Sequence, residues 1–290
     1  MSQSSCDGFH SERLEQRVPL STNDAGQSDA GTLATEEECR TFCERNGGGF
    51  GSQYACRTEG GDGGLVVVCS FNTMCEGRRP EGFCPPHSDV EAPLCGRYFA
   101  AMAATEAASV IAFERIASEL DAHGAPAKLV SATRGAALEE SRHFRMAAGL
   151  ARRFGVKARR GDVAPRRDRS LHQLGLENAR EGVVRETLGA AFGEWQAHRA
   201  AEPAVRQVMR RIARDEASHA ALSFAIDEWV RRRSTAEERA ELDAERATAL
   251  ESFGREIEVP VPDELVARAG LPAPRVARAP FDVASARLFS

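Results

Sequence analysis

Apolar side chains recur every three or four residues through four long segments of the chain, which places them along one face of an α-helix. The helices predicted from this pattern cover residues 96–123, 125–154, 170–198 and 203–232. A shorter, weakly amphipathic helix is expected over residues 235–253, and the proline-rich tail behind it either packs along the helices or stays loose. The pattern therefore predicts an all-α fold for the larger, later part of the chain.

Local signals agree with the ends of these helices. Gly124 and Gly155 directly follow the first two segments, and glycine commonly ends a helix. Ser170 stands where the third segment needs an N-cap, and Pro203 suits the first turn of the fourth. The first and second helices are thus joined by almost nothing, as are the third and fourth. Each pair is predicted to form an antiparallel hairpin.

A longer connection separates the two hairpins. Residues 155–169 show no period. Fully extended they reach about 50 Å, whereas the first predicted helix is about 42 Å long. This connection can therefore cross the length of the helices, which makes the second and third helices parallel. The predicted fold is a four-helix bundle made of two antiparallel hairpins joined by a long crossover.

The first third of the chain differs in composition, because it is rich in glycine and polar residues and holds every cysteine. The eight cysteines are Cys6, Cys39, Cys43, Cys56, Cys69, Cys75, Cys84 and Cys95. An even number of cysteines crowded into a short stretch is typical of a disulfide framework, so four disulfides are predicted. A zinc module or free thiols are the alternatives, although the chain has no Cys-x-x-Cys pair.

Composition also predicts the order of domains. The expected organisation is a poorly ordered polar segment (1–30), a small cysteine-rich module (31–95), the bundle (96–233) and an additional helix with its tail (234–290). Only two regular elements are predicted inside the module. They are a short helix over residues 36–45 and a strand over residues 65–70.

Cysteine usage and charge bear on where the chain works and what it binds. Disulfides favour an exported protein of the periplasm or cell envelope, but the first ten residues lack the basic start and apolar core of a signal peptide. A start further upstream, or reduced thiols in the cytoplasm, would each resolve this conflict. A net charge of -5 with mixed signs gives no reason to expect nucleic acid as a partner. The longest apolar runs also fall far short of the roughly 20 residues that a membrane-spanning helix needs.

Carboxylates interrupt each of the four apolar stripes near its middle. They are Glu106, Glu140, Glu181 and Glu216, in chain order. Burying an unpaired carboxylate costs on the order of several kcal/mol, because the charge loses its hydration. Because all four helices repeat that cost at mid-length, a common compensation is expected, and a metal centre would supply it.

Histidines stand at a matching spacing. Glu140 and His143 form a Glu-x-x-His pair, as do Glu216 and His219, and residues three apart share one helical face. Glu106 precedes Glu140 by 34 residues and, in the second hairpin, residue 181 precedes residue 216 by 35. Two hairpins related by a pseudo-twofold axis would bring four carboxylates and two imidazoles to one point. Two metal ions bridged by carboxylates would use all six.

This pattern resembles the ferritin-like superfamily: rubrerythrins, bacterioferritins and carboxylate-bridged di-iron oxidases. The resemblance covers about residues 96–232 and is closest at 177–182 (ENAREG) and 215–219 (DEASH). It implies two iron ions, with manganese or a mixed manganese–iron pair as alternatives. It assigns lone ligands (Glu106, Glu181), bridging carboxylates (Glu140, Glu216) and terminal ligands (His143, His219). The cysteine-rich segment has no counterpart in those families and lacks the paired Cys-x-x-Cys of a rubredoxin-type site.

Three further acids are candidates for a supporting role. Glu139 and Asp215 each precede a proposed bridging glutamate and could accept a hydrogen bond from a metal-ligating histidine; Glu139 could equally be a solvated surface charge. Glu177 lies one turn before the third-helix ligand, where it could be an extra ligand, a carboxylate on the path of incoming iron or the partner of an inward arginine. Arg185 and Glu186 lie off the stripe and are interpreted as ordinary ion-pair residues.

The function hypothesis follows from the resemblance. The leading hypothesis is a di-metal oxidoreductase of the ferroxidase or peroxide-reducing type, with O₂ or peroxide as its small-molecule substrate. Hydroxylation of an organic substrate is less favoured, because no pattern identifies a substrate pocket. The second hypothesis is a non-catalytic metal-binding or structural envelope protein whose cysteine-rich module contacts a protein partner. A bundle that has lost its metals is the third.

Overall fold

The computed structural model describes the backbone of residues 13–19, 55–61, 64–72, 77–86, 91–165, 168–258 and 261–288. Side chains are described from residue 77 onward within these ranges, except at residue 287. This part of the chain is mostly helical, in agreement with the predicted all-α class. None of its helices is long and apolar enough to cross a membrane.

The helices follow the predicted segments closely. They are α2 (Leu94–Ala122), α3 (Ala127–Arg153), α4 (Leu171–Glu177), the π-helical η1 (Asn178–Glu186), α5 (Thr187–Arg199), α6 (Pro203–Arg231), α7 (Ala236–Glu256), the π-helical η2 (Leu265–Ala269) and α8 (Pro274–Leu288). The third predicted helix is therefore continuous but not uniform, because its middle is η1. This π-helical stretch is a departure from the prediction, and it changes which side chains face the centre of the molecule.

The predicted helix ends are present. Gly124 and Gly155 have φ angles of 74° and 82°, in the left-handed region that glycine adopts without strain. Ser170 caps α4 by accepting a hydrogen bond from the backbone of Gln173, whose side chain accepts one from the Ser170 backbone in return. Pro203 occupies the first turn of α6. Local residue chemistry thus accounts for where these helices start and stop.

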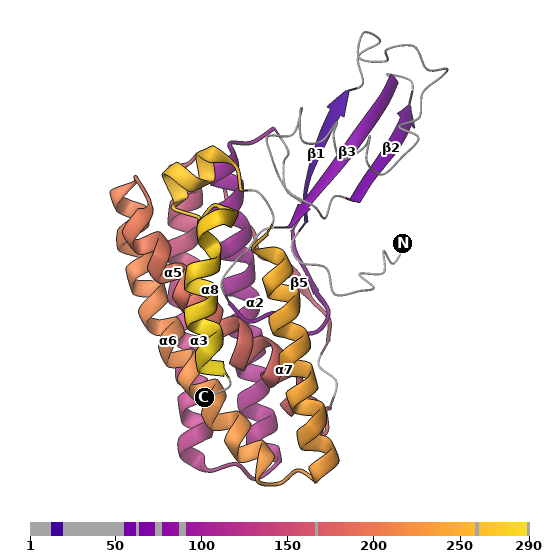
Figure 1. Ribbon diagram of the computed structural model, residues 1–290, viewed down its shortest axis with the longest axis vertical. Coiled ribbons are helices and arrows are strands. Elements are labelled where there is room, and N and C mark those ends of the chain that lie inside the picture. The colour runs from indigo at the N-terminus through magenta and orange to yellow at the C-terminus, as the bar shows by residue number, and fades with distance from the viewer. Residues whose placement is uncertain are drawn as a thin grey trace.

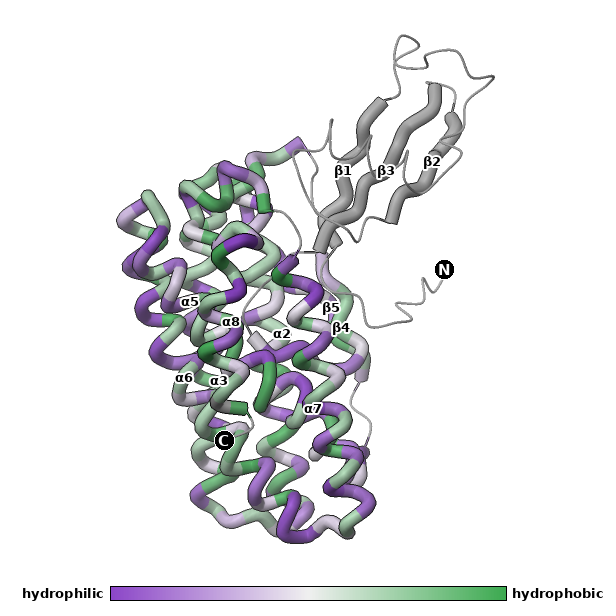
Figure 2. The backbone as a smooth tube through the Cα atoms, viewed as in Figure 1, coloured by the Kyte–Doolittle hydropathy of each residue, from purple (hydrophilic) through white to green (hydrophobic). Residues whose placement is uncertain are grey.

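The long helices lie alongside one another in two pairs. Helix α2 packs along α3, and α5 packs along α6, while α3 and η1 both contact α6 (Figure 1). Figure 2 shows hydrophobic and hydrophilic residues alternating along each helix, as expected of helices that bury one face. Two apolar clusters lie at opposite ends of α2: one contains Phe99 and Met209, the other Leu120 and Trp229. The middle of α2 lies between them.

The connection between α3 and α4 follows the length of α2. Near its start, Val156 lies so close to Gly96 that a Cβ there would meet it at 2.5 Å. Near its end, the backbone carbonyl of Arg169 lies 3.0 Å from Nε2 of His123, at the other end of α2. Between these points β5 (Asp162–Val163) pairs with β4 (Phe83–Cys84), which ties the connection to the segment before α2.

The C-terminal region packs onto the second pair of helices. Helix α7 contacts η1, and α8 contacts α5 (Figure 1). Phe253 of α7 and Phe281 of α8 join Phe192 of α5 in one apolar cluster. The tail therefore packs along the helices, which is one of the two predicted alternatives. Its helix α8 was not expected, because it contains Pro280. Proline removes one helical hydrogen bond, and apolar packing compensates here.

The N-terminal third contains an antiparallel sheet in the order β1–β3–β2, formed by β1 (Arg13–Pro19), β3 (Gly64–Asn72) and β2 (Ala55–Gly61). Strand β3 contains the predicted strand over residues 65–70. Strand β1 falls where no regular structure was expected; it forms by backbone pairing with β3, which needs no apolar period. The helix predicted over residues 36–45 lies outside the described residues.

The prediction of four disulfides is wrong at Cys95, which is a free and fully buried thiol. Cys95 lies in the first turn of α2, where its Sγ is 4.0 Å from the backbone carbonyl of Glu264. Cys95 therefore packs in an apolar cluster and forms no disulfide. Cys84 is disulfide-bonded, to a cysteine whose side chain is not described. The side chains of Cys6, Cys39, Cys43, Cys56, Cys69 and Cys75 lie outside the described part.

We expect Cys95 to resist alkylation in the native protein. Burial raises the pKa of its thiol to about 12, and Glu264 adds to the rise, so the reactive thiolate is scarce. Iodoacetamide followed by peptide mapping should leave Cys95 unmodified in native protein. The same treatment in denaturant without reductant should alkylate it. Recovery of Cys95 in a disulfide-linked peptide would contradict the structure.

Candidate metal centre

Six acidic and histidine side chains meet in the interior of the bundle, at the level of the middle of α2. They come from four elements: Glu106 from α2, Glu140 and His143 from α3, Glu186 from η1, and Glu216 and His219 from α6. Each is at most 1 % exposed. Side chains that usually face water thus lie together in the part of the bundle that water reaches least.

The six side chains form two overlapping groups, each able to hold one metal ion. The first contains Glu106, Glu140, His143 and Glu216; the second contains Glu140, Glu186, Glu216 and His219. Within each group the potential ligand atoms all lie within 4.8 Å of one another. Glu140 and Glu216 belong to both groups, which is the arrangement expected of bridging carboxylates.

The two shared glutamates use separate oxygens toward the two histidines. Oε2 of Glu140 lies 3.6 Å from Nδ1 of His143, and its Oε1 lies 3.0 Å from Nδ1 of His219. Oε1 of Glu216 lies 3.4 Å from Nδ1 of His143, and its Oε2 lies 3.8 Å from Nδ1 of His219. Each carboxylate therefore directs one oxygen to each histidine.

Two further glutamates each belong to one group only. Oε2 of Glu106 is 3.6 Å from Nδ1 of His143. Oε2 of Glu186 is 3.9 Å from Nδ1 of His219. Glu106 and Glu186 therefore hold equivalent positions at opposite ends of the cluster. Each group thus contains one glutamate of its own, one histidine and the two shared glutamates.

The structure brings together five of the six residues named from the sequence, and replaces Glu181 with Glu186. The reason is the π-helical stretch η1. Five residues make about 1.4 turns of an α-helix, which would turn Glu186 away from the face that carries Glu181. In a π-helix hydrogen bonds join residues five apart, so the same five residues make roughly one turn. Glu186 then points to the centre, and Glu181 lies one turn away from it.

Glu181 lies outside the cluster. Its contacts are two arginines and a backbone amide. Its Oε1 lies 3.3 Å from Nε of Arg180 and 4.0 Å from Nε of Arg185. Its Oε2 accepts a hydrogen bond from the backbone of Arg79 at 3.3 Å. Of the three roles considered for Glu177, the structure supports the arginine partner, because its Oε2 lies 3.2 Å from Nη1 of Arg169.

Two acids outside the cluster hold the two histidines. Nε2 of His143 lies 3.2 Å from Oδ2 of Asp215, and Nε2 of His219 lies 3.1 Å from Oε2 of Glu139. The pairs are crossed between the helices. Asp215 of α6 meets the histidine of α3, and Glu139 of α3 meets the histidine of α6. Because an ionised carboxylate only accepts hydrogen bonds, each Nε2 carries the proton. A ring that also loses the proton of its Nδ1 would present the lone pair of that atom to the centre.

The donor atoms of the cluster suit a cation. Both oxygens of Glu106, Glu140, Glu186 and Glu216 and the Nδ1 atoms of both histidines are buried without a hydrogen-bond partner. Buried polar atoms are nearly always paired in proteins, and a charged group left unpaired costs several kcal/mol, on the order of an ion's effective desolvation penalty. Carboxylate oxygens and imidazole nitrogens are also the ligands that iron and manganese accept.

Protons take the place of cations when none is bound. Burial raises the pKa of Glu106 well above its usual range, and the charge on Glu140 adds to the rise. Burial and the charge on Glu216 have the same effect on the pKa of Glu186. Burial opposes ionisation of Glu140 and Glu216 too, but their neighbours, including both histidines, outweigh it and lower both pKa values. The two outer glutamates thus hold their protons more strongly than the two shared ones.

The histidines respond to the same charges. Burial acts to lower the pKa of His219, but the carboxylates of Glu140 and Glu216 outweigh it and raise the pKa to about 12. The pKa of His143 is also raised, against burial, by Glu106 and by the same two carboxylates. The raised pKa values of both histidines favour a positive charge on each ring, which offsets part of the carboxylate charge.

Arg78 reaches the cluster from outside the four long helices, and the sequence pattern gave no sign of it. Its side chain is fully buried, with Nε 3.5 Å from Oε1 of Glu186. Its Nη2 donates to Oδ1 of Asn178 at 2.9 Å and to Oγ of Ser223 at 3.0 Å. Gly182 makes room for it, because a Cβ there would lie 1.9 Å from Nη2. A glycine inside a predicted helix was the one available signal.

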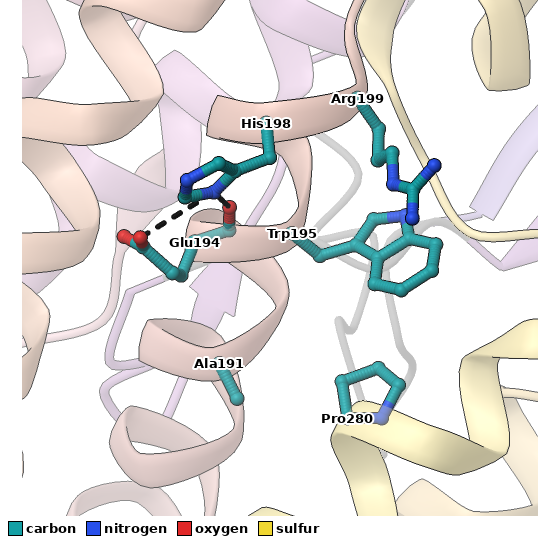
Figure 3. A pocket seen from close by; sticks show the side chains of 6 residues that line it. All are labelled: Ala191, Glu194, Trp195, His198, Arg199 and Pro280. Atoms are coloured by element: carbon teal, nitrogen blue, oxygen red, sulfur yellow. Dashed lines mark hydrogen bonds and ion pairs between the residues drawn. The ribbon is translucent and has the colours of Figure 1, made fainter.

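A surface pocket elsewhere lacks the features of this cluster. It lies between α5 and α8, and is lined by Ala191, Glu194, Trp195, His198, Arg199 and Pro280 (Figure 3). Nδ1 of His198 is satisfied by the backbone carbonyl of Glu194 at 2.9 Å, and the Arg199 guanidinium lies 4.9 Å from the centre of the Trp195 ring. These contacts are ordinary surface pairings.

Comparison with known proteins identifies no relative whose function could be transferred to this chain. No protein-family model, curated protein or solved structure matches it. What the chain does is therefore inferred from its buried carboxylates and histidines.

Proposed function

We propose that this chain is a ferritin-like di-metal protein, and that its two ions are iron, with manganese or a mixed pair as alternatives. The residues that would hold them are Glu106, Glu140, His143, Glu186, Glu216 and His219. The carrying observation is the set of buried carboxylate oxygens and Nδ1 atoms without hydrogen-bond partners. Two divalent cations would offset the four carboxylate charges in full.

The packing of the helices supports the ferritin-like assignment. Such bundles consist of two helix pairs linked by one long crossover, with a glutamate and a Glu-x-x-His pair contributed by each half. Here α2 packs with α3 and α5 with α6, and the connection between the pairs touches both ends of α2. Glu186 takes the position of the lone glutamate in the second half.

We propose an oxidoreductase of the ferroxidase or O₂- or peroxide-reducing type. Iron bound at such a site supplies electrons for the reduction of O₂ or peroxide. The chain's own contribution is to order the ligands and keep the site dry. Asp215 and Glu139 hold the two imidazoles in the tautomer that exposes Nδ1. The apolar clusters at both ends of α2 limit the access of water to the site.

A non-catalytic metal-binding or structural protein of the cell envelope is the second candidate. Two observations favour it. All six donor side chains are closed to solvent, which would slow the loss of bound metal. The disulfide at Cys84 suits an oxidising compartment. The rate of reaction with O₂ or peroxide separates the two candidates, because the second predicts bound metal without chemistry.

Removing a terminal ligand should lower metal content. His143→Ala should bind about one ion per chain or fewer, because the first group loses its only nitrogen ligand. It should also lose the near-ultraviolet absorbance that ferrous iron and O₂ produce in the unaltered protein. Elemental analysis and absorbance measure these effects. His198→Ala, on the surface of α5, is the matched control and should keep two ions. Full metal content in His143→Ala would refute the assignment.

A second pair of variants tests the π-helical correction. Glu186→Gln removes one charge and one ligand from the second group, so it should retain only about one ion per chain. Glu181→Gln alters a glutamate of the same stretch whose contacts are the arginines, so it should retain two. Elemental analysis after dialysis against trace iron compares them. The opposite ranking would mean that the helix presents Glu181 to the metals.

Metal binding should release protons and strengthen as pH rises. The pKa values of Glu106, Glu186, His143 and His219 are all raised, so each of these groups holds its proton to a higher pH than usual. A ligand must be deprotonated, so acid competes with metal. Calorimetric titration with Mn²⁺ in buffers of different ionisation enthalpy should detect protons released as the ions bind. Binding that is independent of pH between 6 and 8 would contradict this.

A further inference from the structure

Arg78 brings a permanent positive charge to one end of the metal centre. The chain around it is fixed from several sides. Oγ of Ser109 on α2 donates to the backbone carbonyl of Arg78 at 2.8 Å, and the backbone of the next residue donates to Glu181 on η1. The guanidinium also lies 5.0 Å from the centre of the Phe113 ring. An arginine side chain is a cation with five N–H donors and no acceptor.

Arg78 lies within ion-pair distance of only one of the two metal-binding groups. Its Nε faces Oε1 of Glu186, while Oε2 of the same glutamate faces His219. Glu186 therefore has one oxygen directed at the arginine and one at the second group. The guanidinium also reaches a glutamate outside the cluster, because Nη1 lies 3.8 Å from Oε1 of Glu177. Glu106, the equivalent of Glu186 in the first group, has no arginine or lysine within ion-pair distance among the described residues.

The outer carboxylates do not rank the two groups, because each is itself paired with an arginine. Oδ2 of Asp215, which holds His143 of the first group, lies 2.9 Å from Nε of Arg211. Glu139, which holds His219 of the second group, lies 3.1 Å from Nη2 of Arg142. The asymmetry between the two groups therefore rests on Arg78.

We propose that Arg78 makes the two metal positions unequal. It acts as a positioning residue that takes one oxygen of Glu186 and weakens the binding of a cation by the second group. The first group therefore fills first, and the second ion binds less tightly and is exchanged more readily. This inference rests on the proposed di-metal function. It goes beyond it because it ranks the two positions and assigns the ranking to a residue outside the four ligand-bearing helices.

Stepwise titration of the full-length metal-free protein with Co²⁺ tests the ranking. Calorimetry and visible absorbance should resolve two steps of about one ion each in the unaltered protein. In Arg78→Met the weaker step should tighten by about tenfold or more, because a unit charge near a divalent ion is removed. Arg78→Lys keeps the charge and should keep the two steps apart. This matched pair separates the effect of charge from that of packing.

A second pair of variants keeps the test decisive if Arg78→Met fails to fold, which circular dichroism would reveal. Glu186→Gln should lose the weaker step and keep the tighter one, whereas Glu106→Gln should lose the tighter one. Two equal steps in the unaltered protein, or a loss of the tighter step in Glu186→Gln, would overturn the inference while leaving the di-metal function intact. Absence of any Co²⁺ binding would overturn both.

Discussion

Mutual repulsion among four buried carboxylates is the constraint on which the arrangement of this protein depends. The ligand atoms of Glu106, Glu140 and Glu216 lie within 4.8 Å of one another, as do those of Glu140, Glu186 and Glu216, and all are away from water. Such a cluster persists only where positive charge or protons reach it. The histidines supply positive charge from within and Arg78 supplies it from one end. Under the proposed function, metal ions would complete the compensation.

Most of the fold and much of the site could be predicted from the sequence, because both follow from regular helices. In α2, α3 and α6 a constant period of 3.6 residues relates position in the sequence to position on a face, so Glu106, Glu140 and Glu216 were found by counting. Glu181 was chosen by the same count, but the structure places Glu186 in the cluster in its stead. A π-helical stretch changes the period, and no residue type marks it in advance as proline or glycine marks a helix end.

Contacts made across long stretches of sequence were the part that could not be predicted. Arg78 carries no periodic signal, since it stands in a short irregular segment and acts through residues about a hundred positions later in the chain. Cys95 was grouped with the other cysteines by composition, although its position in the first turn of α2 makes it part of the apolar core. Crossed pairs such as His143 with Asp215 were foreseen only as a type of contact.

The contact between Arg78 and Gly182 bears on where the helical domain begins in the sequence. A boundary drawn by composition at residue 96 would leave Arg78 on the cysteine-rich side. Cutting there would leave an empty space beside η1 and expose Glu186 to unrelieved repulsion. The pairing of β4 with β5 would be lost as well. We therefore expect a fragment that begins at residue 96 to be less stable than one that begins at residue 77.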